Sequence, residues 1–428
     1  MKNFIQITAI FFLTIFSANA QQEKGITGLN NWLNNWTEFK ASKAEYPEAN
    51  QILAGNITAN TKLFKKNTYQ LQGNVYVTNN AVLTIEPGTV IIGDFQSKGT
   101  LIITKGASII ADGLETDPIV FTSNNSLKKA GDWGGIVLLG DAPINKYGGI
   151  SSVNLDLNPA LTTFGGSNPA YNAGILRFVR IEFAGAKVQS SGENFNALLL
   201  AGIGNKTILE NIMVSFSAGD SFEFLGGNLI LNQLVSFRSS SNDYKFNYGA
   251  QVNINNSLAI RSPFLRSKYG SRCLDIASYD RKEEVDFSKK QTSVIATNLT
   301  LANNSENINA DIESGLIKEA IFISENSSIQ CKRTVVSGFS PAVLLDDQIQ
   351  INDENLKKLK FEAMYFNNCK GNLFVENNTN NEDLESWYGQ SAFFNVYSKG
   401  NNSETFIDFT NDKKPDFRLQ LSEITASK

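Results

Sequence analysis

The sequence contains no histidine among its 428 residues. This absence excludes Ser-His-Asp and Cys-His catalysis and removes the most common zinc ligand. Cysteine is almost as scarce, because only Cys273, Cys331 and Cys369 are present, and three cysteines leave at least one unpaired. We expect them to be small core residues. Proline is also rare, at nine residues, and no Pro-rich or Ser-rich linker divides the chain into domains.

Neither sign of charge dominates the sequence. The formal net charge is −4, and acidic and basic residues are interspersed, which argues against a nucleic-acid partner. Beyond the N-terminal segment no apolar run is long enough for a transmembrane helix, so we expect no membrane span. We also expect no cofactor and no metal site.

The first 20 residues have the features of a signal peptide. Lys2 is followed by an apolar run from Phe4 to Phe16 and then by Ser17-Ala18-Asn19-Ala20, an A-x-A-like cleavage site. This pattern predicts cleavage after Ala20 and export to the periplasm, the outer membrane or the cell surface. No cysteine follows the cleavage site, so we expect no lipid anchor there.

The rest of the chain consists of short β-branched runs separated by turn-forming residues. Clear examples are 75–77, 82–85, 101–104 and 119–122, none of which continues into a helical pattern. Further on, one strand pattern recurs about every 22 residues, as Val214, Val235 and Leu258 illustrate. The segments that align without gaps are 180–183, 213–216, 234–237, 257–260 and 298–301.

A strand that recurs at this interval predicts a solenoid. Stacking the aligned segments puts Phe183, Phe216 and Phe237 in one interior column and Val214 and Val235 in the next. Parallel strands joined in this way wind with a right hand. We therefore predict an all-β chain whose residues 55–428 form a single right-handed parallel β-helix.

Residues 21–54 are expected to form a short N-terminal segment and cap. Leu29, Trp32, Leu33, Trp36 and Phe39 have the spacing of an amphipathic helix or turn, which would cover one end of the solenoid. A second interpretation is that Trp32 and Trp36 dock a partner. The aromatic C-terminal stretch is expected to close the other end.

Asparagine precedes the aligned strands at one fixed offset. Asn211, Asn232 and Asn255 each stand three positions before an aligned valine or leucine. Asparagine at such a point can adopt a left-handed turn and stack its amide on the next coil. The alternative is that asparagine is simply frequent in this chain.

Several segments resemble one family. Residues 55–60, 83–91, 131–136, 176–185 and 220–227 are similar to exported β-helix proteins common in Bacteroidota. The resemblance implies a pectate-lyase-like β-helix, export to the cell envelope, and frequent genetic association with TonB-dependent outer-membrane receptors. It implies no particular activity.

This chain departs from the family pattern at residues 242–249. Relatives have an acid-rich run there that could hold a cation, whereas this chain has Lys245 among the expected acids. Calcium requires six to eight oxygen ligands, usually from several carboxylates. We therefore expect no calcium site at this position.

Two classes of function remain open. An enzyme that hydrolyses polysaccharide would need two carboxylates about 5 to 10 Å apart, and a lyase would need a basic residue with acids nearby. Charged residues follow the aligned strand in several coils and could also bind carbohydrate without cleaving it. The candidates for this site are Asp220, Glu223, Asp243, Arg261 and Asp275.

A non-catalytic binding function is favoured, because long insertions interrupt the coils at 141–175, 186–195, 263–291 and 303–318. The insertion 263–291 mixes aromatic with basic residues, a composition typical of interfaces. The residues that we expect to bind a partner are Phe264, Arg266, Tyr269 and Arg272, with Trp32 and Trp36 as the second candidate surface. The expected partner is an outer-membrane TonB-dependent receptor complex, or alternatively polysaccharide. The other possibility is that the insertion folds back and buries its aromatic groups.

Overall fold

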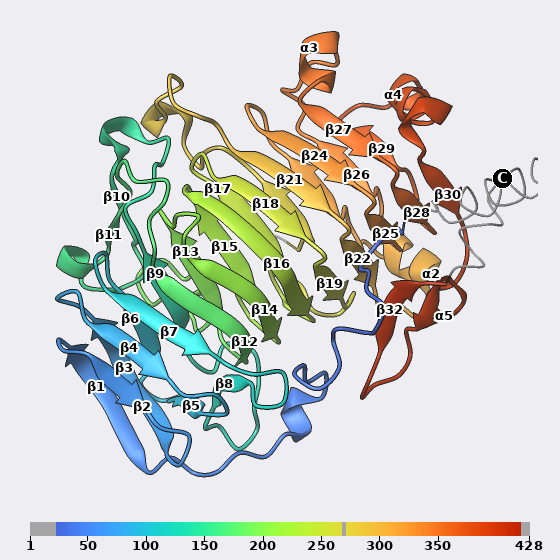
Figure 1. Ribbon diagram of the computed structural model, residues 1–428. Coiled ribbons are helices and arrows are strands. Elements are labelled where there is room, and N and C mark those ends of the chain that lie inside the picture. Colours follow the sequence, from blue (N-terminus) through green and yellow to red (C-terminus); the bar gives the residue numbers. More distant parts are fainter. Residues whose placement is uncertain (1–22, 268–270, 421–428) are drawn as a thin grey trace, which may run out of the picture.

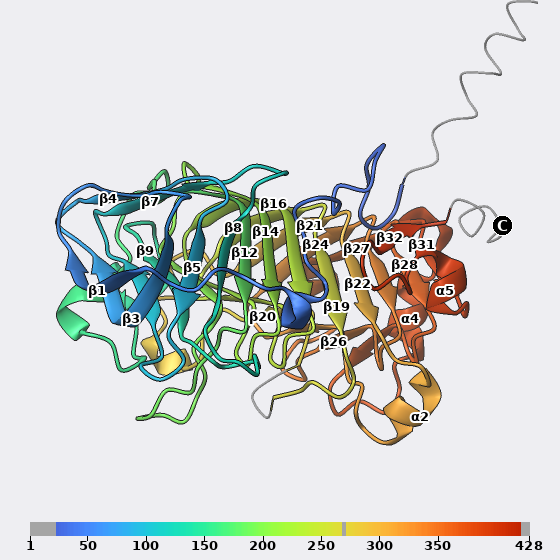
Figure 2. The ribbon, with the colours of Figure 1, turned by 90° about the horizontal axis from the view of Figure 1, so that it is seen from below.

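The computed structural model describes residues 23–267 and 271–420. Within these residues the chain winds into one right-handed parallel β-helix, which confirms the prediction from the repeats (Figure 1 and Figure 2). None of the described helices is long and apolar enough to cross a membrane. The proposed signal peptide, residues 1–20, lies outside the described part of the chain.

The strands form three stacks, and each strand pairs in parallel with the strand of the next coil. Stack 1 contains β2 (Thr61–Leu63), β4 (Val82–Ile85), β7 (Ser108–Asp112), β18 (Gln251–Asn255), β21 (Ser293–Thr297), β24 (Ser328–Lys332) and β27 (Leu359–Glu362). Stack 2 contains β5 (Val90–Gly93), β8 (Ile119–Ser123), β19 (Leu258–Arg261), β22 (Thr300–Asn303), β25 (Val335–Ser337), β28 (Tyr365–Asn367) and β30 (Val396–Ser398). Stack 3 contains β6 (Thr100–Ile103), β9 (Gly135–Leu139), β13 (Leu198–Ala201), β15 (Phe222–Leu225), β17 (Tyr244–Asn247), β20 (Leu274–Ile276), β23 (Ile321–Ile323), β26 (Val343–Leu345) and β29 (Leu373–Val375).

Five longer strands bend around a corner and belong to two stacks. β1 (Gln51–Ile57) and β3 (Thr68–Val77) pass from stack 2 into stack 3. β12 (Gly174–Glu182), β14 (Ile208–Ser215) and β16 (Asn228–Phe237) pass from stack 1 into stack 2.

Short helices and two antiparallel hairpins lie outside the stacks. The helices are η1 (Ala41–Lys43), η2 (Tyr147–Gly149), η3 (Pro159–Leu161), η4 (Lys282–Glu284), η5 (Ser391–Phe393), α2 (Ile308–Glu313), α3 (Asp353–Leu356), α4 (Glu382–Tyr388) and α5 (Asn402–Thr405). The hairpins are β10 (Ser151–Ser152) with β11 (Thr163–Phe164) and β31 (Phe406–Asp408) with β32 (Asp416–Leu419).

The corner from stack 1 to stack 2 contains a residue with positive φ in successive coils. These residues are Phe178, Asn211, Gln233, Asn256, Asn298, Arg333 and Ala363. Asn211 therefore adopts the left-handed conformation expected of it. In the next two coils the corner falls one residue later than expected, at Gln233 and Asn256 rather than at Asn232 and Asn255.

The position of the corner sets the strand register, and it corrects the predicted columns. Val235 pairs with Leu258 as expected, but Val214 pairs with Ser236 rather than with Val235. A slip of one residue exchanges the two faces of a strand. The interior column consists of the residues three positions after each corner, which are Ile181, Val214, Ser236, Ala259 and Leu301.

The predicted aromatic column exists, but it lies on the outside of stack 2. The rings of Phe183 and Phe216 stack with centroids 5.4 Å apart, and those of Phe216 and Phe237 meet edge to face at 5.8 Å. Phe216 and Phe237 belong to a lateral apolar cluster, and none of the three rings belongs to the main core. An outward apolar face of this kind needs a cover.

Residues 24–43, called the strap, provide that cover. They run lengthwise along stack 2 (Figure 2), and Leu33, Trp36 and Phe39 pack against its outward side chains. The strap forms turns and η1 rather than an amphipathic helix, and it covers a side of the solenoid rather than an end. This corrects the predicted N-terminal cap. The reason is that the outward valine and phenylalanine side chains of stack 2 offer a longer apolar surface than the end of the solenoid.

The C-terminal residues cover the last coils. Leu384 and Tyr388 of α4 are buried in the main core, and Phe393 packs against it. Phe406 instead joins the lateral cluster under the strap. Cys273 and Cys331 are buried in the main core, Cys369 is half-buried beside it, and all three are free thiols.

The insertion 263–291 is not one loop, because β20 in its middle joins stack 3. The part before β20 connects stack 2 to stack 3. The part after it connects stack 3 to stack 1 and packs on the insertion 141–175, where Lys146 Nζ lies 2.5 Å from Glu284 Oε2. The surplus residues are therefore divided between two edges of the solenoid.

Candidate functional site

The loops that join stack 2 to stack 3 lie along one edge of the solenoid, here called the 2–3 edge. Polar residues repeat there two positions before successive strands of stack 3. They are Asp220, Asn242, Arg272 and Glu319, which precede β15, β17, β20 and β23. Because these strands are in parallel register, the four residues form one column.

Hydrogen bonds connect this column from coil to coil. Asp220 Oδ1 accepts a hydrogen bond from the backbone N–H of Asn242 at 2.9 Å. The side-chain oxygen of Asn242 accepts one from the backbone N–H of Arg272 at 3.0 Å. Arg272 Nε donates to Glu319 Oε1 at 2.6 Å, and its guanidinium lies 3.7 Å from the ring centre of Phe322.

A second column on the outward face of stack 3 alternates in charge. Glu223, Lys245 and Asp275 are direct neighbours in register on β15, β17 and β20. Lys245 Nζ lies 2.9 Å from Glu223 Oε1, and Arg272 Nη1 lies 3.0 Å from Asp275 Oδ1. Asn196 Nδ2 donates to the second oxygen of Glu223 at 2.5 Å. Each carboxylate in this column is therefore engaged by the protein itself.

Asp243 and Arg261 form a buried ion pair beneath these columns. Arg261 Nη1 lies 2.9 Å from Asp243 Oδ2, and it also donates to the carbonyl oxygen of Ser241 at 2.8 Å. Ser236 Oγ donates to the other oxygen of Asp243 at 2.5 Å. The pair ties the end of β19 to the residue before β17, and only Arg261, which is 3% exposed, reaches the lining of a cleft.

Burial and pairing act in opposite directions on these groups. Burial raises the pKa values of Glu223, Asp243 and Asp275, while their partners Lys245, Arg261 and Arg272 oppose the rise. The charge of Glu223 in turn raises the pKa of Lys245 well above its ordinary value. Lys245 therefore stays protonated at neutral pH and is a poor general base.

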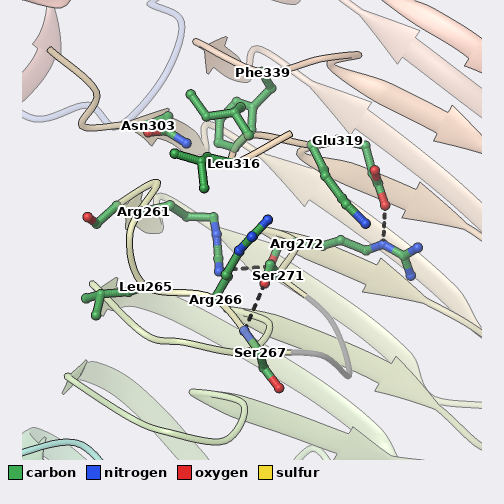
Figure 3. Close-up of a pocket in the computed structure, with 13 residues that line it drawn as sticks. Arg261, Leu265, Arg266, Ser267, Ser271, Arg272, Asn303, Leu316, Glu319 and Phe339 are labelled. Atoms are coloured by element: carbon green, nitrogen blue, oxygen red, sulfur yellow. Dashed lines mark hydrogen bonds and ion pairs between the residues drawn. The ribbon is translucent and has the colours of Figure 1, made fainter. Parts of the chain in front are cut away.

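An open cleft lies beside the columns, between residues 262–267 and 271–273 on one side and residues 304–320 on the other. This loop cleft has a volume of about 490 Å³ (Figure 3). Arg272 and Glu319 are paired with each other in its wall, whereas Arg266 stands in it and donates to the carbonyl oxygen of Gly315 at 2.8 Å. The lining residues include Arg266, Lys318, Leu265, Leu316, Ile317 and Phe339.

Two cations of the loop cleft are not neutralised internally. Arg266 and Lys318 are exposed, and within residues 23–267 and 271–420 neither has a carboxylate within ion-pair distance. Phe264, next to the cleft on the same loop, is 75% exposed. The cleft thus combines free positive charge with apolar side chains.

A smaller cavity of about 250 Å³ borders the columns at the preceding coils and shares the lining residue Ser267 with the loop cleft. Asp220, Glu223 and Lys245 line it together with Asn196 and Asn242. This cavity gathers two of the five residues predicted for carbohydrate. Asp275 lies in the second column, and Asp243 and Arg261 lie below it in their own ion pair.

The structure divides the residues predicted for a partner. Phe264 and Arg266 are exposed on the loop cleft, but Arg272 is held by Asp275 and Glu319. Tyr269 lies outside the described residues.

Trp32 and Trp36, the second candidate surface, stack on each other in the strap with ring centroids 6.3 Å apart. Trp32 is half-buried, and Trp36 is fully buried and packs against Phe178. Trp36 is therefore a packing residue of the strap, with no surface left for a partner.

Lys318 and Glu319 were not predicted as site residues from the sequence. A signal for Glu319 was present, because it stands two positions before a strand of stack 3, as Asp220 and Arg272 do. The insertion before β23 hid this offset. Among the described residues, no group of three or more His, Cys, Asp and Glu side chains is arranged to hold a metal ion.

Fold and site together define a class of protein: a parallel β-helix with two columns of polar and charged residues and an open cleft on one edge. Residues 55–408 match the family model described as the pectate-lyase-like beta helix domain, and the chain belongs to this family. The searches of curated proteins and of solved structures found no match. The family agrees with the β-helix resemblance seen in the sequence, while the Bacteroidota origin and export remain predictions.

Proposed function

We propose that this protein is a non-catalytic binding protein and that the loop cleft is its binding surface. The observation that supports this proposal most directly is how the charges of the 2–3 edge are distributed. The carboxylates Asp243, Glu223 and Asp275 are engaged by internal cations, whereas Arg266 and Lys318 at the cleft have no such partner. The surface left for a ligand is cationic and apolar.

This distribution argues against hydrolysis at the predicted acidic residues. A glycosidase needs one carboxylate to protonate the leaving group and a second to attack or to activate water. Asp243 is fully buried in its ion pair, and both oxygens of Glu223 are bound, to Lys245 and to Asn196. These groups are arranged to hold neighbouring coils together.

A polysaccharide-active enzyme, or a carbohydrate-binding protein, is the second candidate. One observation favours it: Asp220, Glu223 and Lys245 line a common cavity. Burial raises the pKa of Glu223, which would suit a general acid if a ligand displaced Lys245. The ion pair must break first, so we rank this candidate below binding.

We further propose that the chain is exported and acts at the outer membrane or the cell surface. Residues 1–20 read as a signal peptide, and this motivates the proposal. The proposed partner is an acidic surface of an outer-membrane receptor complex, such as a TonB-dependent receptor. Its anchors would be Phe264, Arg266 and Lys318, since exposed aromatic and basic residues commonly dominate interfaces.

Two variants test the binding surface. Arg266→Gln with Lys318→Gln neutralises the cleft, and Lys206→Gln with Lys399→Gln removes the same charge from exposed sites outside it. We expect the first variant to melt like the wild type and to be lost from outer membranes in co-sedimentation, while the second still sediments with them. Equal sedimentation of the two variants would contradict the proposal.

The same samples test for catalysis. The protein is incubated with a panel of neutral and acidic polysaccharides, and new reducing ends and ultraviolet-absorbing unsaturated ends are measured. We expect neither product. Release of either product, and its loss in Glu223→Gln, would favour the enzyme instead.

A further inference from the structure

A second cleft lies under the strap and shares no lining residue with the loop cleft. This strap cleft has a volume of about 530 Å³, within the size range of small-molecule sites. Three parts of the chain that are far apart in sequence form most of its walls, and Asn304 and Glu306 of the loop after β22 complete them. The three parts are the strap around Phe39, the outward face of stack 2, and the loop and β32 of the C-terminal hairpin, which lies beside the strap in Figure 1.

Five phenylalanine rings form the apolar part of the strap cleft's lining, beside charged and polar side chains. Phe39 meets Phe237 edge to face at 5.0 Å and Phe417 at 5.9 Å, and Phe409 meets Phe417 at 5.2 Å. Phe216 is half-buried beside Phe237 and keeps part of its surface in the cleft. The walls thus favour a ligand with a flat apolar body.

Arg238 brings an unpaired positive charge to this aromatic site. It follows β16 directly, and its guanidinium lies 5.1 Å from the ring centre of Phe237. Its Nε is buried and has no hydrogen-bond partner. Within the described residues its side chain forms no ion pair, although a guanidinium offers five donors. The terminal N–H groups of Arg238, for which no hydrogen bond is found among the described residues, are left to meet an acceptor from a ligand.

The hydrogen bond and charge of Lys40 chiefly lower the pKa of the nearby acid Asp412, and the charge of Arg238 adds to this without forming an ion pair among the described residues. Asp412 on the rim is paired with Lys40, with Nζ and Oδ2 3.0 Å apart, and it is 73% exposed. Lys43 adds a further exposed cation to the same rim. The positive charges of Lys40, Lys43 and Arg238 therefore exceed the negative charges of Asp412 and Glu306.

We propose that the strap cleft binds a small molecule with one anionic head on a flat apolar body, such as an aromatic carboxylate. The carboxylate pairs with Arg238, whose planar guanidinium suits two parallel hydrogen bonds. The apolar body lies against Phe216 and Phe237. This site is independent of the proposed binding function of the loop cleft.

Dye fluorescence tests the site with the mature protein. Anilinonaphthalene sulfonate, which combines an anionic head with an aromatic body, is titrated into the protein and then displaced by naphthoate. Naphthylmethanol carries the body without the charge, and inorganic phosphate carries charge without the body. We expect naphthoate to displace the dye and the other two compounds to fail at the same concentration.

Three variants assign the binding to the strap cleft. Arg238→Gln keeps a residue type that this chain already accommodates at positive φ, at Gln233. It should weaken naphthoate binding by about tenfold or more, as expected for losing a charge-assisted pair. Arg333→Gln removes an arginine of similar φ outside the cleft and should leave naphthoate binding unchanged. Ser42→Trp fills the cleft from the exposed η1 and should abolish binding.

Circular dichroism melting confirms that each variant is folded before it is titrated. The proposal is overturned if Arg238→Gln binds naphthoate as tightly as the wild type, or if Ser42→Trp still binds it. Displacement by phosphate alone would also overturn it, because the apolar body would then contribute nothing.

Discussion

Arg261 Nη1 lies 2.9 Å from Asp243 Oδ2, and the two side chains are only 3% and 0% exposed. They come from adjacent coils, at the end of β19 and immediately before β17. Each charge is costly to bury alone and acceptable as a pair. The ion pair therefore makes the stability of one coil depend on the correct placement of the next.

Breaking this pair should destabilise the protein strongly. Asp243→Asn leaves Arg261 buried without a counter-charge, which we expect to lower the free energy of unfolding by about 3 to 5 kcal/mol. Urea unfolding followed by circular dichroism measures this. The control is Glu354→Gln, which breaks the exposed pair with Lys358 and should cost less than about 1 kcal/mol. Equal midpoints for the two variants would contradict the structural role.

Alkaline pH should first stabilise the protein through Lys24. Burial lowers the pKa of Lys24 to about 8 from its ordinary 10.5. Between these values the unfolded chain holds a proton that the folded protein has released, so the free energy of unfolding rises with pH there. We expect the urea midpoint to rise from about pH 8 to about pH 10. Lys24→Met should flatten this rise and the exposed Lys43→Met should not; a rise that survives in Lys24→Met would refute the assignment.

Trp36 should act in stability and not in partner binding. Trp36 lies in the strap and is fully buried against Phe178, so Trp36→Ala removes a large side chain from a packed site. The expected loss is about 3 to 5 kcal/mol in the free energy of unfolding. Trp387, which is partly exposed, serves as the control and should cost much less as alanine. If Trp36→Ala unfolds like the wild type but loses a membrane partner, the docking interpretation of the strap would return.

Calcium should not stabilise the fold. Lys245 stands between Glu223 and Asp275, where the resemblance led us to look for acids, and its ammonium already neutralises Glu223. A cation would have to displace it. Melting temperatures in excess calcium and in chelator should agree, because only a ligand bound by the folded state raises them. The same two melting temperatures are measured for Lys245→Gln, which removes the ammonium, as a comparison. A large calcium-dependent rise in the melting temperature of the wild type would contradict this prediction.

Much of the fold was visible in the sequence because its signals are local. Short β-branched runs, turn residues between them and a repeat near 22 residues indicate a β-helix without any knowledge of contacts. The register between neighbouring strands was harder to predict from the sequence. Val214 and Val235 align in sequence, yet the left-handed corner at Gln233 moves Val235 to the outside. Only the backbone conformation of that corner decides which face is interior.

The sequence predicted part of the candidate site's residues but not their roles. Asp220, Glu223, Asp243, Arg261 and Asp275 do gather on one edge, as their repeated position after the aligned strand indicated. The sequence could not tell which charges neutralise one another, since the partners come from neighbouring coils. For the same reason Arg272 was predicted as an anchor, whereas Glu319, 47 residues later, binds it.

The sequence by itself determined the repeated parallel strands, the lack of histidine chemistry and the edge on which charge collects, because these depend on residue type and spacing along the chain. The tertiary structure alone decided which carboxylates are consumed in ion pairs, that the strap covers a side rather than an end, and that Arg238 forms no ion pair within residues 23–267 and 271–420. These outcomes depend on contacts between segments up to hundreds of residues apart, such as Lys24 with Phe394, and no local pattern encodes such distances.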